Sequence, residues 1–171
     1  MRSKEFSNSC FFNALVELLD TKEFEEIQIQ EICMKAGYNR STFYRSFKTK
    51  VDVLLYELKK ELNKYHDLVA KSQDYSFKTK TKLLFDAIKD SSNLLLIAHK
   101  AGLEKELYDL FYEIYPFKEK DELLYGKYYK PFRAAGIFKT IIQWLTSGMK
   151  ESTSEMADIL FNIIDNCKAE Y

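Results

Sequence analysis

The sequence is poor in the residues that mark tight turns. It contains only five glycines and two prolines among 171 residues, whereas β-sandwiches, barrels and phosphate-binding loop folds need such residues at their turns. It also carries no net charge, because 26 basic and 26 acidic residues cancel. The total charge therefore gives no argument for a polyanionic partner. Long helices are the default prediction, and any functional charge must come from its distribution along the chain.

Cysteines and long apolar runs are scarce as well. Cys10, Cys33 and Cys167 are widely spaced and form no metal-binding motif, so we expect three reduced thiols, no metal and no cofactor. The longest apolar run, Leu94 to Ala98, is far shorter than the roughly 20 residues that a membrane span needs. The N-terminal segment lacks the apolar core of a signal peptide. These absences predict a cytoplasmic protein with no membrane partner.

Apolar residues at helical spacing are abundant. Hydrophobic residues make up 46% of the chain, including 13 phenylalanines and 12 tyrosines, which is ample for a core at this length. Their recurrence at steps of three and four predicts an all-α fold of about nine helices. Pro131 is expected to kink or divide the eighth of them. The expected helices cover residues 6–19, 29–36, 40–47, 50–69, 77–88, 93–101, 103–115, 123–147 and a final stretch from the Ser152/Glu155 capping box to Cys167.

Basic charge is concentrated in one zone without acids. Residues 32–51 contain no Asp or Glu, although the preceding segment, Asp20 to Glu31, has five acids against one base. Two short helices joined by a turn at Gly37, with small polar and basic residues at the start of the second, are what a helix-turn-helix requires. The basic residues of this zone are Lys35, Arg40, Arg45, Lys48 and Lys50.

The start of the second short helix has the residues that major-groove recognition needs. Ser41 and Thr42 are small enough to enter the groove, and Arg40 is suited to guanine edges. We expect Tyr44, Lys48 and Lys50 to hold phosphates. A run of basic residues is more often a solvated surface, but here it coincides with an acid-free helix-turn-helix pattern. The pattern therefore favours DNA binding.

The segment IQIQEICMKAGYNRSTFYRSFKTKVDVLL resembles the DNA-binding segment of the tetracycline-repressor (TetR) family, over about Phe6 to Leu55. The most specific features are the Ala36-Gly37 turn, the Thr42-Phe43-Tyr44 run, Phe47, and Lys50 ahead of an apolar helix. The resemblance implies that Asn39 to Tyr44 forms the recognition helix, that Thr42 and Tyr44 contact the DNA backbone, and that Lys50 binds phosphate. It also implies that Phe43 and Phe47 are core residues.

Three positions depart from that family pattern, and one of them, Val51 in place of the usual acid after the lysine, is expected to have no effect. Gln28 stands where Thr or Ser usually caps the first helix of the motif, so we expect a weaker cap. Tyr38 replaces a small aliphatic residue and is expected to place an aromatic ring near the DNA surface. Further along, residues 128–150 and the capped final helix resemble the C-terminal dimerisation pair of small regulators in this family.

These observations divide the chain into a TetR-type helix-turn-helix domain, residues 1–51, and a helical regulatory and dimerisation domain, residues 52–171. The expected DNA contacts are Gln28, Lys35, Tyr38, Asn39, Arg40, Ser41, Thr42, Tyr44, Arg45, Lys48 and Lys50. A small apolar effector is a second hypothesis, with plain core as the alternative, for Leu84, Phe85, Ile88, Leu107, Phe111 and Tyr112. The expected dimer interface comprises Phe138, Ile141, Ile142, Leu145, Met156, Ile159, Leu160, Ile163 and Ile164.

The favoured function is transcriptional regulation, with repression at a palindromic operator. Two recognition helices of a two-fold dimer would read half-sites roughly 34 Å apart, so a shift of the helix that begins at Lys50 would prevent simultaneous docking. The alternative is a helical protein–protein interaction module that does not bind DNA. We expect no enzyme and no catalytic residue, because no nucleophile, base or metal ligands converge in the sequence, and His66 and His99 receive no role. The operator, the effector, the regulated genes and the sign of regulation stay open.

Overall fold

The computed structural model describes residues 4–114 and 126–169, with side chains described for 4–113 and 127–164. Every regular element in these residues is helical, so the predicted all-α class is confirmed. The helices are α1 Lys4–Leu19, α2 Ile29–Ala36, α3 Arg40–Tyr44, α4 Lys50–Lys71, α5 Phe77–Asp90, α6 Ser92–Lys100, α7 Glu104–Ile114, α8 Gly126–Thr146 and α9 Thr153–Ala169, with a 3-10 turn, η1, at Phe24–Glu26.

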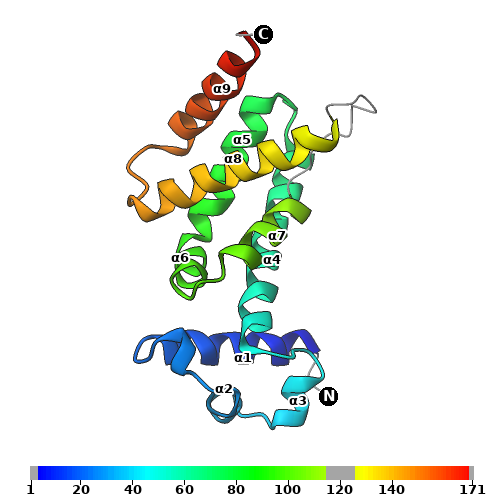
Figure 1. The fold of residues 1–171 in the computed structure, drawn as a ribbon. Coiled ribbons are helices and arrows are strands. Elements are labelled where there is room, and N and C mark those ends of the chain that lie inside the picture. The colour runs from blue at the N-terminus through cyan, green and yellow to red at the C-terminus, as the bar shows by residue number, and fades with distance from the viewer. Residues whose placement is uncertain (1–3, 115–125, 170–171) are drawn as a thin grey trace.

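Figure 1 shows how these helices divide the molecule. Helices α1, α2 and α3 form one end, and α4 rises from them into a bundle made with α5 to α9. Helix α4 packs against α1 at its start and against α5, α6 and α7 farther along, while α9 lies along α5. Helix α4 therefore belongs to both parts and links the first three helices to the bundle.

One hydrophobic core connects the two parts. It extends from Phe11 in α1 through Leu54 and Leu58 in α4 to Leu160 in α9. Trp144 in α8 packs edge-on against Phe85 in α5, with ring centroids 5.2 Å apart. Its Nε1 donates to the carbonyl of Glu151 at 3.0 Å, which fixes the connection between α8 and α9.

Most of the predicted helices are confirmed within a residue or two, and two differences have simple causes. The third helix ends at Tyr44 rather than Phe47, because the Ser46 amide bonds to the Phe43 carbonyl in a tighter i to i−3 turn. Pro131 was expected to kink or divide the helix, and it does not divide it, because α8 continues through it. Pro131 lies near the start of α8, and its ring removes one intrahelical hydrogen bond, to residue 127.

The described thiols and the cap of α9 also agree with the predictions from the sequence. Cys10 and Cys33 are free, and burial raises the pKa of the Cys33 thiol; the side chain of Cys167 lies outside the described residues. The predicted capping box of α9 is present, since the Ser152 amide donates to Glu155 Oε2 at 2.7 Å and the Glu155 amide to Ser152 Oγ at 3.2 Å. The expected start of α8 near residue 123 and the end of α7 at residue 115 lie outside the described residues.

Candidate nucleic-acid interface

The turn between α2 and α3 depends on one glycine. Gly37 has φ of 71°, a left-handed conformation that costs glycine little and other residues more. Its amide donates to the Met34 carbonyl at 3.2 Å, and the Tyr38 amide to the Cys33 carbonyl at 3.0 Å. The chain therefore leaves α2 with its last carbonyls satisfied and enters α3 at Arg40, three residues after Gly37.

A single side chain organises the start of α3. Asn39 Oδ1 accepts the Thr42 amide at 2.9 Å, the Thr42 hydroxyl at 2.8 Å and the Ser41 hydroxyl at 2.8 Å. This is the N-cap expected from the sequence. Both hydroxyls and the Thr42 amide therefore converge on one oxygen, which fixes the first turn of α3.

Aromatic side chains hold the inner side of α3 against α1. Phe43 is fully buried, and its ring meets that of Phe11 edge-on at 5.2 Å. Phe47, also buried, packs against Phe43 at 5.7 Å and against Tyr56 of α4 at 5.7 Å. The implied core role of Phe43 and Phe47 is thus confirmed, and the opposite side of α3 faces solvent.

The outward side carries five of the eleven predicted DNA contacts. Arg40, Ser41, Tyr44, Arg45 and Lys48 are all exposed. Arg40 Nη2 lies 3.3 Å from the Tyr44 hydroxyl, one helical turn on, and Arg45 Nη2 lies 3.3 Å from Thr42 Oγ1. No carboxylate lies within ion-pair distance of these cations in the part of the chain that the structure describes. Their charge is left uncompensated on one surface.

Two predicted contacts lie away from this surface. Lys35 forms an ion pair with Glu17 of α1 at 2.9 Å. Tyr38 packs its ring against Phe11 with centroids 5.4 Å apart, and its hydroxyl is shielded from solvent without a hydrogen-bond partner in the described residues. The aromatic ring expected near the DNA surface is turned toward the core, because the adjacent ring of Phe11 offers it apolar surface.

Gln28 and Glu31 form a capping box at the start of α2. Glu31 Oε2 accepts the Gln28 amide at 2.9 Å, and Glu31 Oε1 forms an ion pair with Lys22 at 2.5 Å. The hydrogen bond from Lys22 and that from the Gln28 amide hold the pKa of the Glu31 carboxyl below its ordinary value of 4.5. Gln28 itself is exposed and remains in reach of solvent at the edge of the motif.

Lys50 is directed into the protein. Its Nζ donates to the carbonyls of Phe24, Glu25 and Ile27 at 2.5, 2.8 and 2.8 Å. It also lies 4.8 Å from the centroid of the Phe24 ring. Burial of the ammonium lowers the pKa of Lys50 from its ordinary range. The structure therefore separates Lys50 from the exposed cations with which the sequence grouped it.

One capping pair was missed at the sequence level. Asp52 Oδ2 accepts the amides of Lys48 and Thr49 at 2.7 and 2.8 Å, and the Asp52 amide bonds to Thr49 Oγ1 at 3.3 Å. The signal was present as Thr49 followed three residues later by an acid. This box fixes the path from α3 into α4, so it positions Lys48 on the exposed surface.

Two family models match this chain. One, described as bacterial regulatory proteins of the tetR family, matches residues 12–56. The other, described as a transcriptional regulator C-terminal region, matches residues 75–166, more than half of the chain. The chain belongs to the TetR family. The predicted resemblance is confirmed, and it extends beyond the helix-turn-helix.

Curated relatives of this TetR-family chain come from Staphylococcus aureus. An HTH-type transcriptional regulator of strain bovine RF122 / ET3-1 is 27% identical over 123 residues, which is 63% of this chain and 65% of the relative. Its counterpart in strain USA300 is 28% identical over 122 residues, covering 62% and 64%. The chain thus spans just under two thirds of the length of the curated relatives it matches.

Solved structures share the fold. The fatty acid degradation regulator FadR from Bacillus halodurans superposes with a TM-score of 0.55 at 16% identity, covering 92% of this chain and 93% of that one. A TetR transcriptional regulator from Streptococcus agalactiae gives a TM-score of 0.54 at 22% identity, with 94% of each chain covered. At these identities the likeness concerns the fold alone.

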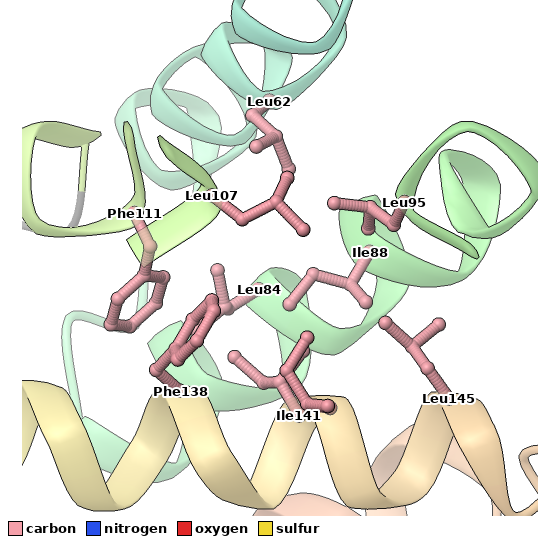
Figure 2. Close-up of a pocket in the computed structure, with 10 residues that line it drawn as sticks. Leu62, Leu84, Ile88, Leu95, Leu107, Phe111, Phe138, Ile141 and Leu145 are labelled. Carbon is pink, nitrogen blue, oxygen red and sulfur yellow. The ribbon is translucent and has the colours of Figure 1, made fainter. Parts of the chain in front are cut away.

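Four of the six predicted effector residues of this TetR-family chain line a small cavity in its core. Figure 2 shows apolar side chains from α4 to α8 converging on it. Leu84, Ile88, Leu107 and Phe111 line it, whereas Phe85 packs on Trp144 and the ring of Tyr112 lies 6.0 Å from that of Tyr108. The cavity measures about 30 Å³, far below the roughly 300 Å³ of a small-molecule site.

The predicted dimer residues fall into two groups. Six are buried within the chain's own core: Phe138, Ile141, Ile142, Leu145, Met156 and Leu160. On α9, Ile159 is 39% and Ile163 50% exposed, and Ile164 is half-buried. The outward face of α8 instead presents Phe132, 74% exposed, together with exposed Ala135 and Gly136. Phe132 was missed because sequence spacing alone does not say which arc of an apolar helix the core covers.

The described residues hold no group of three or more His, Cys, Asp or Glu side chains placed to bind a metal ion. None of the described helices is both long enough and apolar enough to cross a membrane.

Proposed function

We propose that this chain is a DNA-binding transcriptional regulator in the cytoplasm, and that it represses transcription by binding a palindromic operator as a homodimer. The observation that carries the proposal is the exposed, acid-free surface formed by α3 and the loop after it, where Arg40, Arg45 and Lys48 lie unpaired with any carboxylate in the described residues. Phe43 anchors the opposite side of the same helix in the core. A cationic helix presented on a rigid base suits the major groove of DNA.

The proposed contacts follow from the placement of each side chain. Arg40 is the candidate for reading guanine, because its guanidinium lies at the start of the recognition helix. Tyr44, Arg45 and Lys48 are candidates for phosphate contacts, with Ser41 and Thr42 small enough for close approach to the groove. Asn39 contributes indirectly, because its side chain caps the first turn of α3. Gln28 is a peripheral candidate at the edge of the motif, and Lys35 is a candidate that lies apart from this surface, where it pairs with Glu17.

Dimerisation is proposed through the outward faces of α8 and α9. Ile159 and Ile163 lie one turn apart on α9 and are exposed, and Phe132, Ala135 and Gly136 supply an apolar, small-residue face on α8. Apolar side chains exposed on adjacent helices favour association with an identical surface. A two-fold dimer would set two recognition helices about 34 Å apart, one turn of the DNA helix.

Release by a small apolar effector is the regulatory part of the proposal. A ligand entering the cavity of about 30 Å³ among α4 to α8 has to separate the side chains that line it. Because α4 contributes Leu62 to that cavity and also carries the helix-turn-helix, such an expansion would tilt α4 and change the half-site separation. The effector's chemistry is apolar, as the lining is.

The test is selection of bound sites from a random duplex pool, followed by binding measurements at several salt concentrations. We expect an inverted repeat to be enriched and the affinity to fall steeply as salt rises. A matched pool in single-stranded form serves as the control. Failure to enrich any duplex would contradict the proposal and favour the helical protein–protein interaction module instead.

A further inference from the structure

Lys50 stands apart from the other cations of the helix-turn-helix. We propose that it is a positioning residue: its ammonium ties the first turn of α4 to the connection before α2 and so fixes the angle between α4 and the recognition helix. The proposal rests on the proposed DNA-binding function, and it assigns Lys50 no contact with phosphate in the structure's conformation.

The geometry accounts for all the hydrogen-bonding capacity of the side chain. An ammonium group has three N–H donors and no acceptor. Lys50 Nζ has three carbonyl partners, Phe24, Glu25 and Ile27, all within 2.8 Å. Two carbonyls of the η1 turn and the carbonyl of Ile27, the residue after it, converge on this one nitrogen. To reach a phosphate, Lys50 would have to break all three hydrogen bonds, two of them part-buried, at an energetic cost. The Phe24 carbonyl would keep the Ile27 amide at 3.3 Å as its donor.

The hydrogen bonds of Lys50 join the two ends of the helix-turn-helix. Phe24, Glu25 and Ile27 immediately precede α2, and Lys50 is the first residue of α4, immediately after the loop that follows α3. The hydrogen bonds therefore join residues 23 to 26 positions apart and enclose α2 and α3 between them. With this tie in place, a tilt of α4 carries the recognition helix with it as one body.

Lys48 provides a matched comparison two residues earlier. It is exposed, and its side chain makes no hydrogen bond or ion pair within the described part of the chain. Both lysines lie in the same short segment and carry the same charge, so their substitutions change the net charge equally. Only the contacts of their ammonium groups differ.

The experiment compares Lys50→Met, Lys50→Arg and Lys48→Met in the full chain, using the operator selected above and variants with one or two base pairs added to or removed from its centre. For Lys50→Met we expect about tenfold weaker binding at the preferred spacing, broader tolerance of altered spacing, and an unchanged slope of log affinity against log salt. For Lys48→Met we expect the slope to fall by about 0.9 for each phosphate that the side chain no longer neutralises, with spacing preference unchanged.

Lys50→Arg distinguishes a cation that binds a DNA phosphate from one that binds the three carbonyls. It also serves as the test if Lys50→Met does not fold. A guanidinium can hold a phosphate at least as well as an ammonium, but its donors diverge in a plane and cannot converge on three clustered carbonyls. We therefore expect Lys50→Arg to retain the defect in spacing preference. Restoration of wild-type affinity and spacing by arginine, together with a reduced salt slope in Lys50→Met, would overturn the proposal.

A readout without DNA keeps this inference distinct from the proposed function. Hydrogen exchange of the free protein should speed up about tenfold in residues 24–32 and 50–54 of Lys50→Met or Lys50→Arg, and stay unchanged in Lys48→Met. If the wild-type protein binds no duplex but this pattern appears, the proposed function fails and the structural tie stands. Unchanged exchange in these segments would overturn the tie itself.

Discussion

Asn39 Oδ1 accepts the backbone amide of Thr42 at 2.9 Å and thereby closes the first turn of the recognition helix. Replacing Asn39 by alanine should lower the free energy of unfolding by about 1 kcal/mol, because the amide loses its only side-chain partner. Asn39→Asp should retain most of the stability, since aspartate caps equally well. Chemical denaturation of the three proteins is the measurement, and equal midpoints for wild type and Asn39→Ala would contradict the capping role.

Arg40 and Lys48 should affect DNA binding in different ways. Arg40→Ala should reduce discrimination between the selected operator and a scrambled duplex by about 1–3 kcal/mol, because it removes a base contact. Lys48→Ala should weaken binding to both duplexes by a similar factor. Fluorescence anisotropy with both duplexes measures this, and Lys139→Ala is the control, since Lys139 pairs with Glu104 at 2.6 Å in the other part of the molecule. An equal drop in affinity for both duplexes in Arg40→Ala would refute base reading.

Ile163 and Ile142 should respond differently to a carboxylate. Ile163 is 50% exposed on α9, so Ile163→Asp should leave the fold stable and convert the proposed dimer to monomers. Ile142 is 8% exposed and lies in the chain's own core, so Ile142→Asp should destabilise the monomer itself by several kcal/mol. Sedimentation together with thermal unfolding distinguishes the two effects. A wild-type chain that sediments as a 20.2 kDa monomer at micromolar concentration would remove the dimer and the two-half-site mechanism.

Truncation of Leu107 should strongly lower the free energy of unfolding, because Leu107 lines the small cavity among α4 to α8 and is 3% exposed. Leu107→Ala should cost about 2–5 kcal/mol of unfolding free energy, from reduced apolar burial and an enlarged cavity. Leu68→Ala is the control, since Leu68 lies on an exposed part of α4 and should change stability by less than about 0.5 kcal/mol. If Leu107→Ala lost no more unfolding free energy than Leu68→Ala, the bundle core would be loosely packed around Leu107.

Glu31 should make the start of α2 sensitive to acid. Its folded-state pKa is lowered, first by the hydrogen bond from Lys22 and then by the Gln28 amide. Its contribution to stability is therefore complete above the ordinary value of 4.5 and is lost as the pH falls through the lower folded value. The melting temperature of Glu31→Gln should fall less than that of wild type between about pH 5 and about pH 3. Parallel acid profiles would contradict this, and Glu26→Gln, an exposed neighbour, serves as the control.

Local chemistry made much of the fold predictable. Gly37 ends α2 because only a residue at ease with positive φ suits that turn, and Asn39 and Ser152 begin helices because their oxygens reach nearby amides. These interactions span three or four residues, so the sequence specifies them directly. The acid-free zone of residues 32–51 is equally a property of the chain alone.

Tertiary packing decided what residue type and spacing left open. Lys50 and Lys48 are alike in sequence, but only Lys50 meets three carbonyls from a turn more than 20 positions away, so only its ammonium is directed inward. The Tyr38 ring is directed inward because Phe11 lies beside it. Ile142 is buried and Ile163 is exposed because the core covers only one side of each helix. Composition and periodicity determined which helices form and where the charge gathers. Contacts between distant segments determined which side chains are left to meet a partner, because burial depends on what the rest of the chain places against them.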